Sequence, residues 1–254
     1  MKLAYREYGE GQPLVILHGL FGQSDNWNTL ARQFGEKGLR VFAVDQRNHG
    51  LSPHSDNFTF SAMADDLAEF ISFHKLVNPI LMGHSMGGKT VLLFQKQYGG
   101  IASKLIIADI SPRAYKPHHQ DVIEALEAVD LSVVKTRREA EEILTRKISE
   151  PGTREFLLKN LYWKEQQQLD WRFNLNVIAR NYNNITSEVP FYTAELPVLV
   201  VRGENSAYVN DTDVADFKKR FSPCVVATIK GAGHWVHAEK PGPFFETVWS
   251  FIGS

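Results

Sequence analysis

The chain has little of what would tie it to a specialised partner or compartment. Its 254 residues include a single cysteine, Cys224, which excludes an internal disulfide and suits a reducing compartment. We expect this thiol to pack as a small apolar group. The 28 basic and 29 acidic residues leave no strong field of either sign, so nothing favours nucleic acid or an anionic membrane as a partner.

Long apolar runs are also missing. Residues 1–9 alternate like the start of a strand, and no stretch resembles a secretion signal or approaches the length of a membrane span. Internal repeats and low-complexity tracts are absent from the sequence as well. We therefore expect a cytoplasmic protein that does not insert into a membrane.

Short apolar runs alternate with helical patterns in the first half of the chain. The run 40–44 is strand-like, and another such run follows at 79–82. Between them, Met63, Leu67 and Phe70 share one face of a helix. This alternation predicts a parallel sheet with helices on both faces, and the length allows one such core plus an insertion.

The most informative motif follows the strand-like run 79–82. Residues 82–89 read MGHSMGGK and contain the pattern Gly-x-Ser-x-Gly around Ser85. This pattern is typical of a nucleophile elbow, a strained turn from strand to helix that lifts the serine hydroxyl clear of its surroundings. In such a turn the backbone N–H of Met86 points at any oxyanion that forms on the substrate.

The same stretch also fits a different class of enzyme. Gly83, four residues and then Gly88-Lys89-Thr90 match the phosphate-binding loop G-x-x-x-x-G-K-[ST]. Asp109, at the end of a later apolar run, could then serve as the residue that holds magnesium. The local pattern leaves both interpretations open, so the rest of the chain has to separate them.

A second turn supplies what a serine hydrolase needs near its nucleophile. Residues 14–22 read LVILHGLFG, a short buried strand that breaks into a glycine-rich turn of the His-Gly type. There the N–H of Leu20 can face the same point as that of Met86. We therefore predict that Leu20 and Met86 form the oxyanion hole.

The general base is expected near the carboxyl terminus, after the acid in the chain order. Of the nine histidines, only His234 and His237 come late enough. His234 lies in residues 231–235, GAGHW, a loop that can carry it over the edge of the sheet. We assign the base to His234 and assign His237 to packing or to contacts behind the base.

The acid is not where such enzymes commonly carry it. After the strand-like run 196–203 an aspartate is expected, but Ser206 occupies that position. A hydroxyl cannot stabilise an imidazolium as a carboxylate does. Asp109 ends the strand after the elbow helix, and neighbouring strand ends lie about 5 Å apart, so it can reach the same histidine. Glu204 and Asp211 remain the alternative acids.

Five separated motifs, in this order, resemble those of a known family. The whole length resembles the α/β-hydrolase superfamily, and within it the small bacterial YbfF-type acyl esterases. The motifs are residues 47–53 (RNHGLSP), 83–89 (GHSMGGK), 109–112 (DISP), 171–174 (WRFN) and 231–241 (GAGHWVHAEKP).

The resemblance implies hydrolysis of esters or thioesters, with Ser85 as nucleophile, His234 as base and Asp109 as acid. It also implies that Ser206 is a fourth member, hydrogen-bonded into the network. Where the related esterases tend to have proline near this serine, the chain has Ala207.

The predicted fold is thus α/β, an α/β-hydrolase fold with a mostly parallel, doubly wound sheet and an inserted helical cap. Residues 1–111 and 191–254 form the core domain. Residues 112–190 carry one helical pattern after another without strand-like runs, and they leave the sheet at the edge where ligands bind. We expect this segment to cover Ser85 and to set the substrate size.

Several residues are candidates for contact with substrate. The apolar faces of the cap favour an acyl chain, and Phe156 and Trp163 are large enough to form pocket walls. Arg172 could meet an anionic leaving group, although an arginine of this kind more often pins a loop by binding backbone carbonyls. The remaining candidates flank the catalytic motifs: Phe21, His84 and Trp235.

These observations predict a serine carboxylesterase that acts on a small-molecule acyl ester or thioester, without a metal or organic cofactor. The alternatives are an acyl-coenzyme A thioesterase, a binding protein that keeps the triad without turnover, and a nucleotide hydrolase of the phosphate-loop type. The natural substrate, its acyl length and the oligomeric state stay open, and a monomer is compatible with the sequence.

Overall fold

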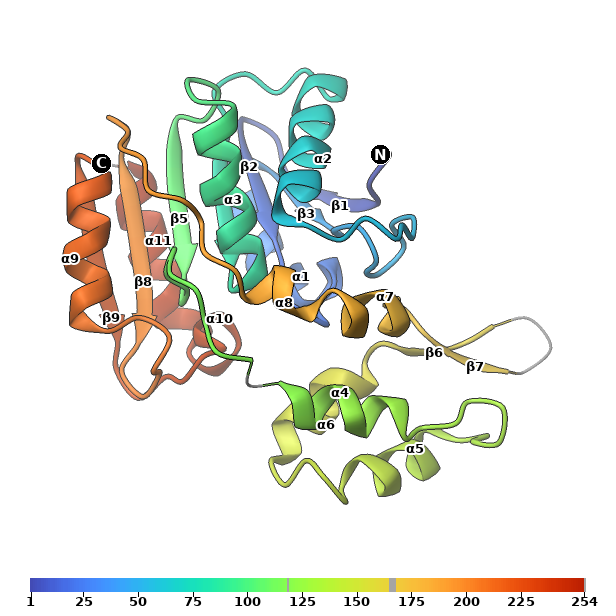
Figure 1. The fold of residues 1–254 in the computed structure, drawn as a ribbon. Coiled ribbons are helices and arrows are strands. Elements are labelled where there is room, and N and C mark those ends of the chain that lie inside the picture. The colour runs from blue at the N-terminus through green and yellow to red at the C-terminus, as the bar shows by residue number, and fades with distance from the viewer. Residues whose placement is uncertain (118, 165–167, 254) are drawn as a thin grey trace.

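A seven-stranded sheet forms the centre of the molecule (Figure 1). The structure, a computed structural model, describes residues 1–117, 119–164 and 168–253. The strand order is β1-β3-β2-β4-β5-β8-β9, and only β1 runs antiparallel to its neighbour. The prediction of a mostly parallel sheet is confirmed. Its strands are β1 (Tyr5–Tyr8), β2 (Gln12–Leu17), β3 (Leu39–Val44), β4 (Ile80–His84), β5 (Lys104–Ala108), β8 (Val198–Gly203) and β9 (Cys224–Ile229).

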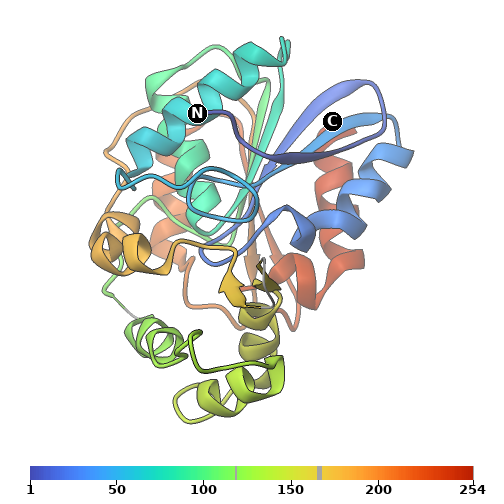
Figure 2. The same ribbon diagram turned by 90° about the vertical axis from the view of Figure 1, so that its right-hand side faces the viewer.

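Helices cover both faces of the sheet (Figure 2). One face carries α2 (Phe60–Phe73), α3 (Met86–Gln97) and α9 (Asp211–Arg220), and the other carries α1 (Asn28–Glu36) and α11 (Pro241–Gly253). The short helices η1 (Ser24–Trp27) and α10 (Val236–Glu239) lie in the loops that lead into α1 and α11.

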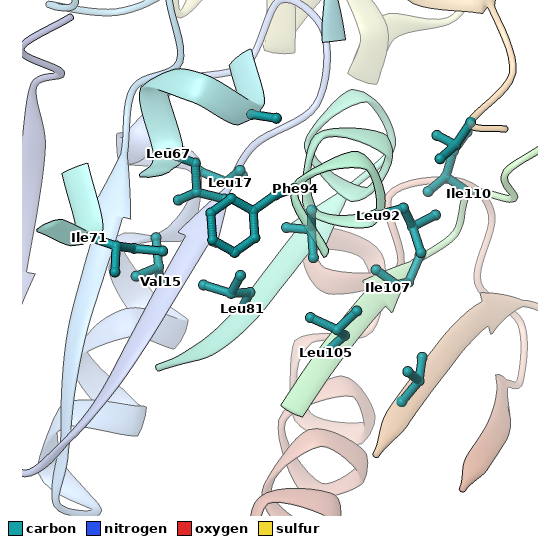
Figure 3. Packing of buried hydrophobic residues seen from close by; sticks show 14 of the residues in the cluster. Val15, Leu17, Leu67, Ile71, Leu81, Leu92, Phe94, Leu105, Ile107 and Ile110 are labelled. Carbon is teal, nitrogen blue, oxygen red and sulfur yellow. The ribbon is translucent and has the colours of Figure 1, made fainter. Parts of the chain in front are cut away.

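The core follows from the alternation of side chains along each strand. On the face of α2 and α3, Phe94 and Leu67 pack against Val15, Leu81 and other strand residues (Figure 3). The opposite strand positions point toward α1 and α11. The side chains on both faces of the sheet are almost completely buried. The interior strands are therefore continuous apolar runs in the sequence.

The segment between β5 and β8 gathers at the carboxyl ends of the parallel strands (Figure 1). It contains α4 (Gln120–Glu127), α5 (Arg137–Leu144), α6 (Pro151–Leu158), α7 (Leu175–Arg180) and α8 (Tyr182–Thr186). Its apolar side chains pack in one buried cluster together with Phe21, Phe58 and Met86, which belong to the core. Residues from both parts therefore share one buried cluster.

The sequence pattern predicts a wholly helical segment, but the segment also contains two short strands. Strands β6 (Leu161–Trp163) and β7 (Leu169–Trp171) pair in an antiparallel two-stranded sheet. Each strand has only three residues, too few for an alternating pattern to show in the sequence. In the described part of the chain, no helix is long and apolar enough to cross a membrane.

Candidate active site

Ser85 stands in a strained turn between β4 and α3. Its backbone angles are φ 51° and ψ −118°, a conformation that non-glycine residues rarely adopt. Close chain approach explains the glycines around it. A Cβ at Gly83 would overlap the backbone of Gly87, and a Cβ at Gly87 would overlap the carbonyl of Leu17 in β2. Larger residues at either position would force the turn apart, so the geometry is that of a nucleophile elbow.

Two backbone donors lie beside Ser85. Met86 is the first residue of α3, so its N–H has no acceptor inside the helix. Leu20 follows β2, and it lines two cavities whose walls also include Ser85. Among the residues described, no acceptor receives the N–H of Leu20. Gly19 brings this loop close to the elbow, since a Cβ there would lie 3.2 Å from the Cβ of Ser85.

The next residue of that loop is held from two sides. Phe21 has a positive φ of 58°, its N–H donates to His49 Nε2 at 3.2 Å, and its carbonyl accepts from Asn160 Nδ2 at 2.8 Å. Burial lowers the pKa of His49 to about 3, so the ring is neutral and its Nδ1 hydrogen donates to the Arg47 carbonyl at 3.0 Å. The N–H of Phe21 therefore has an acceptor, whereas the N–H of Leu20 has none among the described residues.

Asp109 contacts His234. It follows β5 with a positive φ of 49°, and its Oδ2 lies 2.8 Å from His234 Nδ1. Its Oδ1 accepts from the N–H of Gly203 at 3.0 Å, and the Ser206 hydroxyl donates to its Oδ2. The serine at the usual acid position thus binds the carboxylate that comes from the neighbouring strand.

The environment of Asp109 is unusual for a carboxylate. Burial raises the pKa of Asp109 to about 6, although the hydrogen bonds from Ser206 and Gly203 act in the opposite direction.

The alternative acids do not contact His234. Glu204 accepts from the N–H of Gly231 at 2.8 Å, and Asp211 forms an exposed ion pair with Arg202 at 2.9 Å.

Tyr208 is a residue of the site that the sequence did not reveal. Its ring is stacked on His234, with the ring centres 3.7 Å apart and the planes inclined by 13°. Its N–H donates to Ser206 Oγ at 3.2 Å, and its hydroxyl lies 3.5 Å from His119 Nε2. No motif marks this tyrosine. Its only sequence signal is a position two residues after Ser206.

A cavity of about 230 Å³ adjoins both Ser85 and His234. Four of the predicted substrate contacts border it: Phe21, His84, Phe156 and Trp235. The wall also includes residues that were not predicted from the sequence as substrate contacts: His119, Val122, Thr153, Leu157 and Tyr208. Core and inserted segment meet here, since the rings of Phe156 and Trp235 are 5.7 Å apart.

His84 has a second contact besides the cavity. Its Nε2 donates to the carbonyl of His234 at 2.9 Å, and burial holds its pKa well below the ordinary value, so the ring is neutral. It therefore supports the loop that carries His234. His237 is stacked on Trp27 with ring centres 4.1 Å apart, in keeping with the packing role expected for it.

Trp163 and Arg172 do not reach this cavity. The side chain of Trp163 is 59% exposed, and neither residue belongs to the described lining around Ser85. The guanidinium of Arg172 lies over the ring of Tyr162 at 4.0 Å, in a separate groove. Within the described ranges it donates to no backbone carbonyl, contrary to our expectation. Trp163 is the last residue of β6, and Arg172 directly follows β7.

The residues of the phosphate-loop pattern have other partners. Lys89 is buried, and its Nζ donates to the carbonyls of Arg113 at 2.8 Å, Thr186 at 3.5 Å and Ser187. It thus ties α3 to the chain where the segment 112–190 begins and ends. The Thr90 hydroxyl donates within the core as well, to the side chain of Gln46 at 2.9 Å. Over the described residues, no group of three or more His, Cys, Asp or Glu side chains could hold a metal.

Comparisons with known proteins agree with this architecture. The profile described as "Alpha/beta hydrolase family" matches residues 14–247. Esterase YbfF of Escherichia coli K12 is 35% identical over 241 residues, which are 94% of this chain and 92% of that protein. The sn-1-specific diacylglycerol lipase ABHD11 of Mus musculus is 36% identical over 249 residues, 94% of this chain and 80% of that protein.

A solved structure shares nearly the whole fold. The structure described as a marine microorganism esterase is 40% identical, has a TM-score of 0.95 and covers 99% of both chains. The predicted resemblance to this superfamily and to its YbfF-type members is confirmed. The chain belongs to the α/β-hydrolase family, a family of hydrolases in which its similar relatives are named esterases and lipases.

Proposed function

We propose that the protein is a serine carboxylesterase that works through an acyl-enzyme on Ser85. Ser85 Oγ attacks the carbonyl carbon of an acyl ester or thioester while His234 takes the hydroxyl proton. The N–H groups of Leu20 and Met86 hold the oxyanion. His234 then returns the proton to the leaving oxygen or sulfur, and a water molecule activated by His234 releases the acid.

Asp109 has the orienting role in this scheme. Its bond to Nδ1 of His234 leaves Nε2 to accept the serine proton, and its charge stabilises the imidazolium that forms. The Ser206 hydroxyl and the Gly203 N–H fix the carboxylate in position. Ser206 therefore acts through Asp109, as the fourth member of the network, and does not replace it.

The single observation that supports this function most is a shared cavity. The serine of a strained elbow and a histidine held by a buried carboxylate border the same hollow. Because a hydrolase needs nucleophile and base on one substrate, this arrangement favours acyl transfer over nucleotide hydrolysis. Lys89 supports the same choice, because its ammonium already donates to three backbone carbonyls, whereas the lysine of a phosphate-binding loop binds the phosphates of the nucleotide.

We further propose that residues 112–190 act as a cap over this cavity, with residues 1–111 and 191–254 as the core. The division follows the chain path, since the segment leaves after β5 and returns before β8. Phe156 on α6 supports it, because it borders the cavity next to Trp235 of the core.

A fluorophosphonate probe tests the proposed function. We expect one label on Ser85, located by peptide mass spectrometry, and hydrolysis of short p-nitrophenyl esters by the unlabelled protein. Labelling without turnover would instead support a binding protein. Absence of both, together with magnesium-dependent binding of ATP, would support the phosphate-loop alternative and overturn the proposal.

A further inference from the structure

Three hollows meet at the two central residues of the site. The central cavity, of about 230 Å³, is lined by both Ser85 and His234. An inner pocket of about 30 Å³ is lined by Ser85, and its described lining does not include His234. An outer trough of about 1150 Å³ is lined by His234, and its described lining does not include Ser85. The hollows therefore follow one another in the order inner pocket, Ser85, central cavity, His234, outer trough.

The chemistry of acyl transfer indicates which part of the substrate each hollow can hold. The leaving atom has to lie near His234, because this residue returns the proton to it. The carbonyl oxygen has to point at the N–H groups of Leu20 and Met86. One substituent of the carbonyl carbon remains, the acyl chain, and it has to extend on the side of Ser85 away from His234. The inner pocket adjoins Ser85, Leu20 and Met86. Its described lining contains Tyr208, which is stacked on His234, but not His234 itself, so we assign the acyl chain to this pocket.

The inner pocket is small and its walls are fixed. A volume of about 30 Å³ is room for roughly two water-sized groups, because a single water needs about 10–15 Å³ of such space. Lys89 forms one wall and is held by its carbonyl acceptors. Tyr115 forms another, and its hydroxyl accepts from the N–H of Ser111 at 2.8 Å and donates to the carbonyl of Tyr208 at 2.6 Å. These bonds oppose the widening that a long chain would need.

The other side of Ser85 is wide. The central cavity has apolar walls, formed by Phe156, Leu157 and Trp235. It continues into the outer trough, since Phe156, Trp235 and His237 line both. A leaving group that starts at His234 can therefore be bulky and apolar near the ester, and it can extend outward without meeting a closed end.

From this order we propose that the enzyme takes esters with a short acyl group and a large apolar alcohol. The acyl group is of about two or three carbons, and the alcohol begins in the central cavity. The proposal rests on the esterase function proposed above. It changes the expectation from the sequence in one respect: Phe156 lies on the side of the leaving group, whereas Tyr115 and Ile185 of the same inserted segment line the acyl pocket.

The reaction balances without any further reactant. The bond between Ser85 Oγ and the acyl carbon forms, the bond from that carbon to the alkoxide oxygen breaks, and the serine proton passes through His234 to this oxygen. The free alcohol departs through the outer trough. Water then cleaves the acyl-serine and releases the short acid.

Two crossed substrate series test the proposal on the unmodified enzyme. The first keeps p-nitrophenol as the leaving group and lengthens the acyl chain from acetyl to octanoyl. We expect kcat/KM to fall by about tenfold or more along this series. The second keeps the acetyl group and enlarges the alcohol from methyl to hexyl and cyclohexylmethyl, whose alkoxides are similar leaving groups, and here we expect kcat/KM to rise. An octanoyl preference, or a fall along the alcohol series, would overturn the proposal.

Two variants locate the selecting walls. Ile185 lines the inner pocket, and Ile185→Ala should raise the ratio of butyryl to acetyl turnover by about fivefold or more. Phe156→Ala should change the order of the alcohol series and leave the order of the acyl series as it was. The opposite assignment of the two effects would contradict the proposal. A protein that hydrolyses no ester and takes no phosphonate would instead refute the esterase function itself.

Discussion

The ring of Tyr208 lies almost parallel to the imidazole of His234, with the ring centres 3.7 Å apart. The two residues are also joined through Ser206 and Asp109, because the Tyr208 N–H binds the serine hydroxyl that holds the carboxylate. These four residues thus form a closed circuit of contacts, which fixes the plane of the imidazole and the position of its Nδ1. The Nε2 of His119, which precedes α4, lies 3.5 Å from the tyrosine hydroxyl. This contact connects the circuit to the inserted segment.

Tyr208 should therefore act as a positioning residue. We expect Tyr208→Leu to lower kcat by about 10- to 100-fold, because an imidazole that can turn seldom presents Nε2 to Ser85. Tyr208→Phe keeps the aromatic face and should stay within a few-fold of the parent enzyme. Steady-state kinetics with p-nitrophenyl acetate over a pH series check this. An equal loss in both variants, or a loss in KM alone, would show that the ring does not orient His234.

The fold and the position of Asp109 beside His234 could be predicted from the sequence, for physical reasons. Ser85 lies in a local pattern whose glycines the backbone requires, and parallel strand ends meet at one edge, so Asp109 could be placed beside His234. The family and the fold are confirmed by the comparisons. The catalytic roles of these residues stay predictions.

What failed to emerge from the sequence depends on contacts between distant residues. Tyr208 lies in no motif, and its stack on His234 exists only after β8 and β9 bring two loops together. The β6–β7 pair is too short to show a period, and it takes Trp163 and Arg172 to other surfaces. Side-chain identity alone could not separate those two residues from Phe156, which does line the cavity.

Asp109→Asn tests the unusual acid. An asparagine keeps the shape but carries no charge to offset the imidazolium, and it favours the wrong tautomer of His234. We expect turnover to fall by about 10³- to 10⁴-fold. The matched controls Glu204→Gln and Asp211→Asn should cost little, since neither side chain contacts His234 in this structure. Full activity of the Asp109 variant together with a large loss at Glu204 would move the acid to the latter residue.

The raised pKa of Asp109 also predicts a pH dependence of stability. The folded protein holds this proton up to about pH 6, whereas an ordinary carboxyl loses it near 3.8. Between these values the folded state binds more protons than the unfolded chain, so this group lowers the free energy of unfolding as the pH rises.

Asp109→Asn removes that contribution. The difference in the free energy of unfolding, variant minus parent, should therefore become more positive from pH 4 to pH 6. Urea titrations at several pH values measure it. A difference that stays constant or decreases over this range would mean that burial does not raise the pKa of Asp109.

Lys89 should fasten the inserted segment to α3. Lys89→Met removes the donor from three carbonyls and should lower the free energy of unfolding by about 1–3 kcal/mol. We also expect faster hydrogen exchange near Arg113 and Ser187, with the exchange of the central strands unchanged. Lys96→Met, an exposed lysine of the same helix, is the control and should change neither property. Equal exchange in both variants would exclude the fastening role.

The most direct test of the proposed acyl-enzyme mechanism is the turnover of Ser85→Ala. The exposed Ser132→Ala serves as the control, and circular dichroism verifies that both variants are folded. If Ser85 forms the acyl-enzyme, its variant should hydrolyse p-nitrophenyl acetate about 10⁴- to 10⁶-fold more slowly than the parent, while the control keeps full activity. A folded Ser85→Ala protein that retains more than about a tenth of the parent turnover would contradict the account.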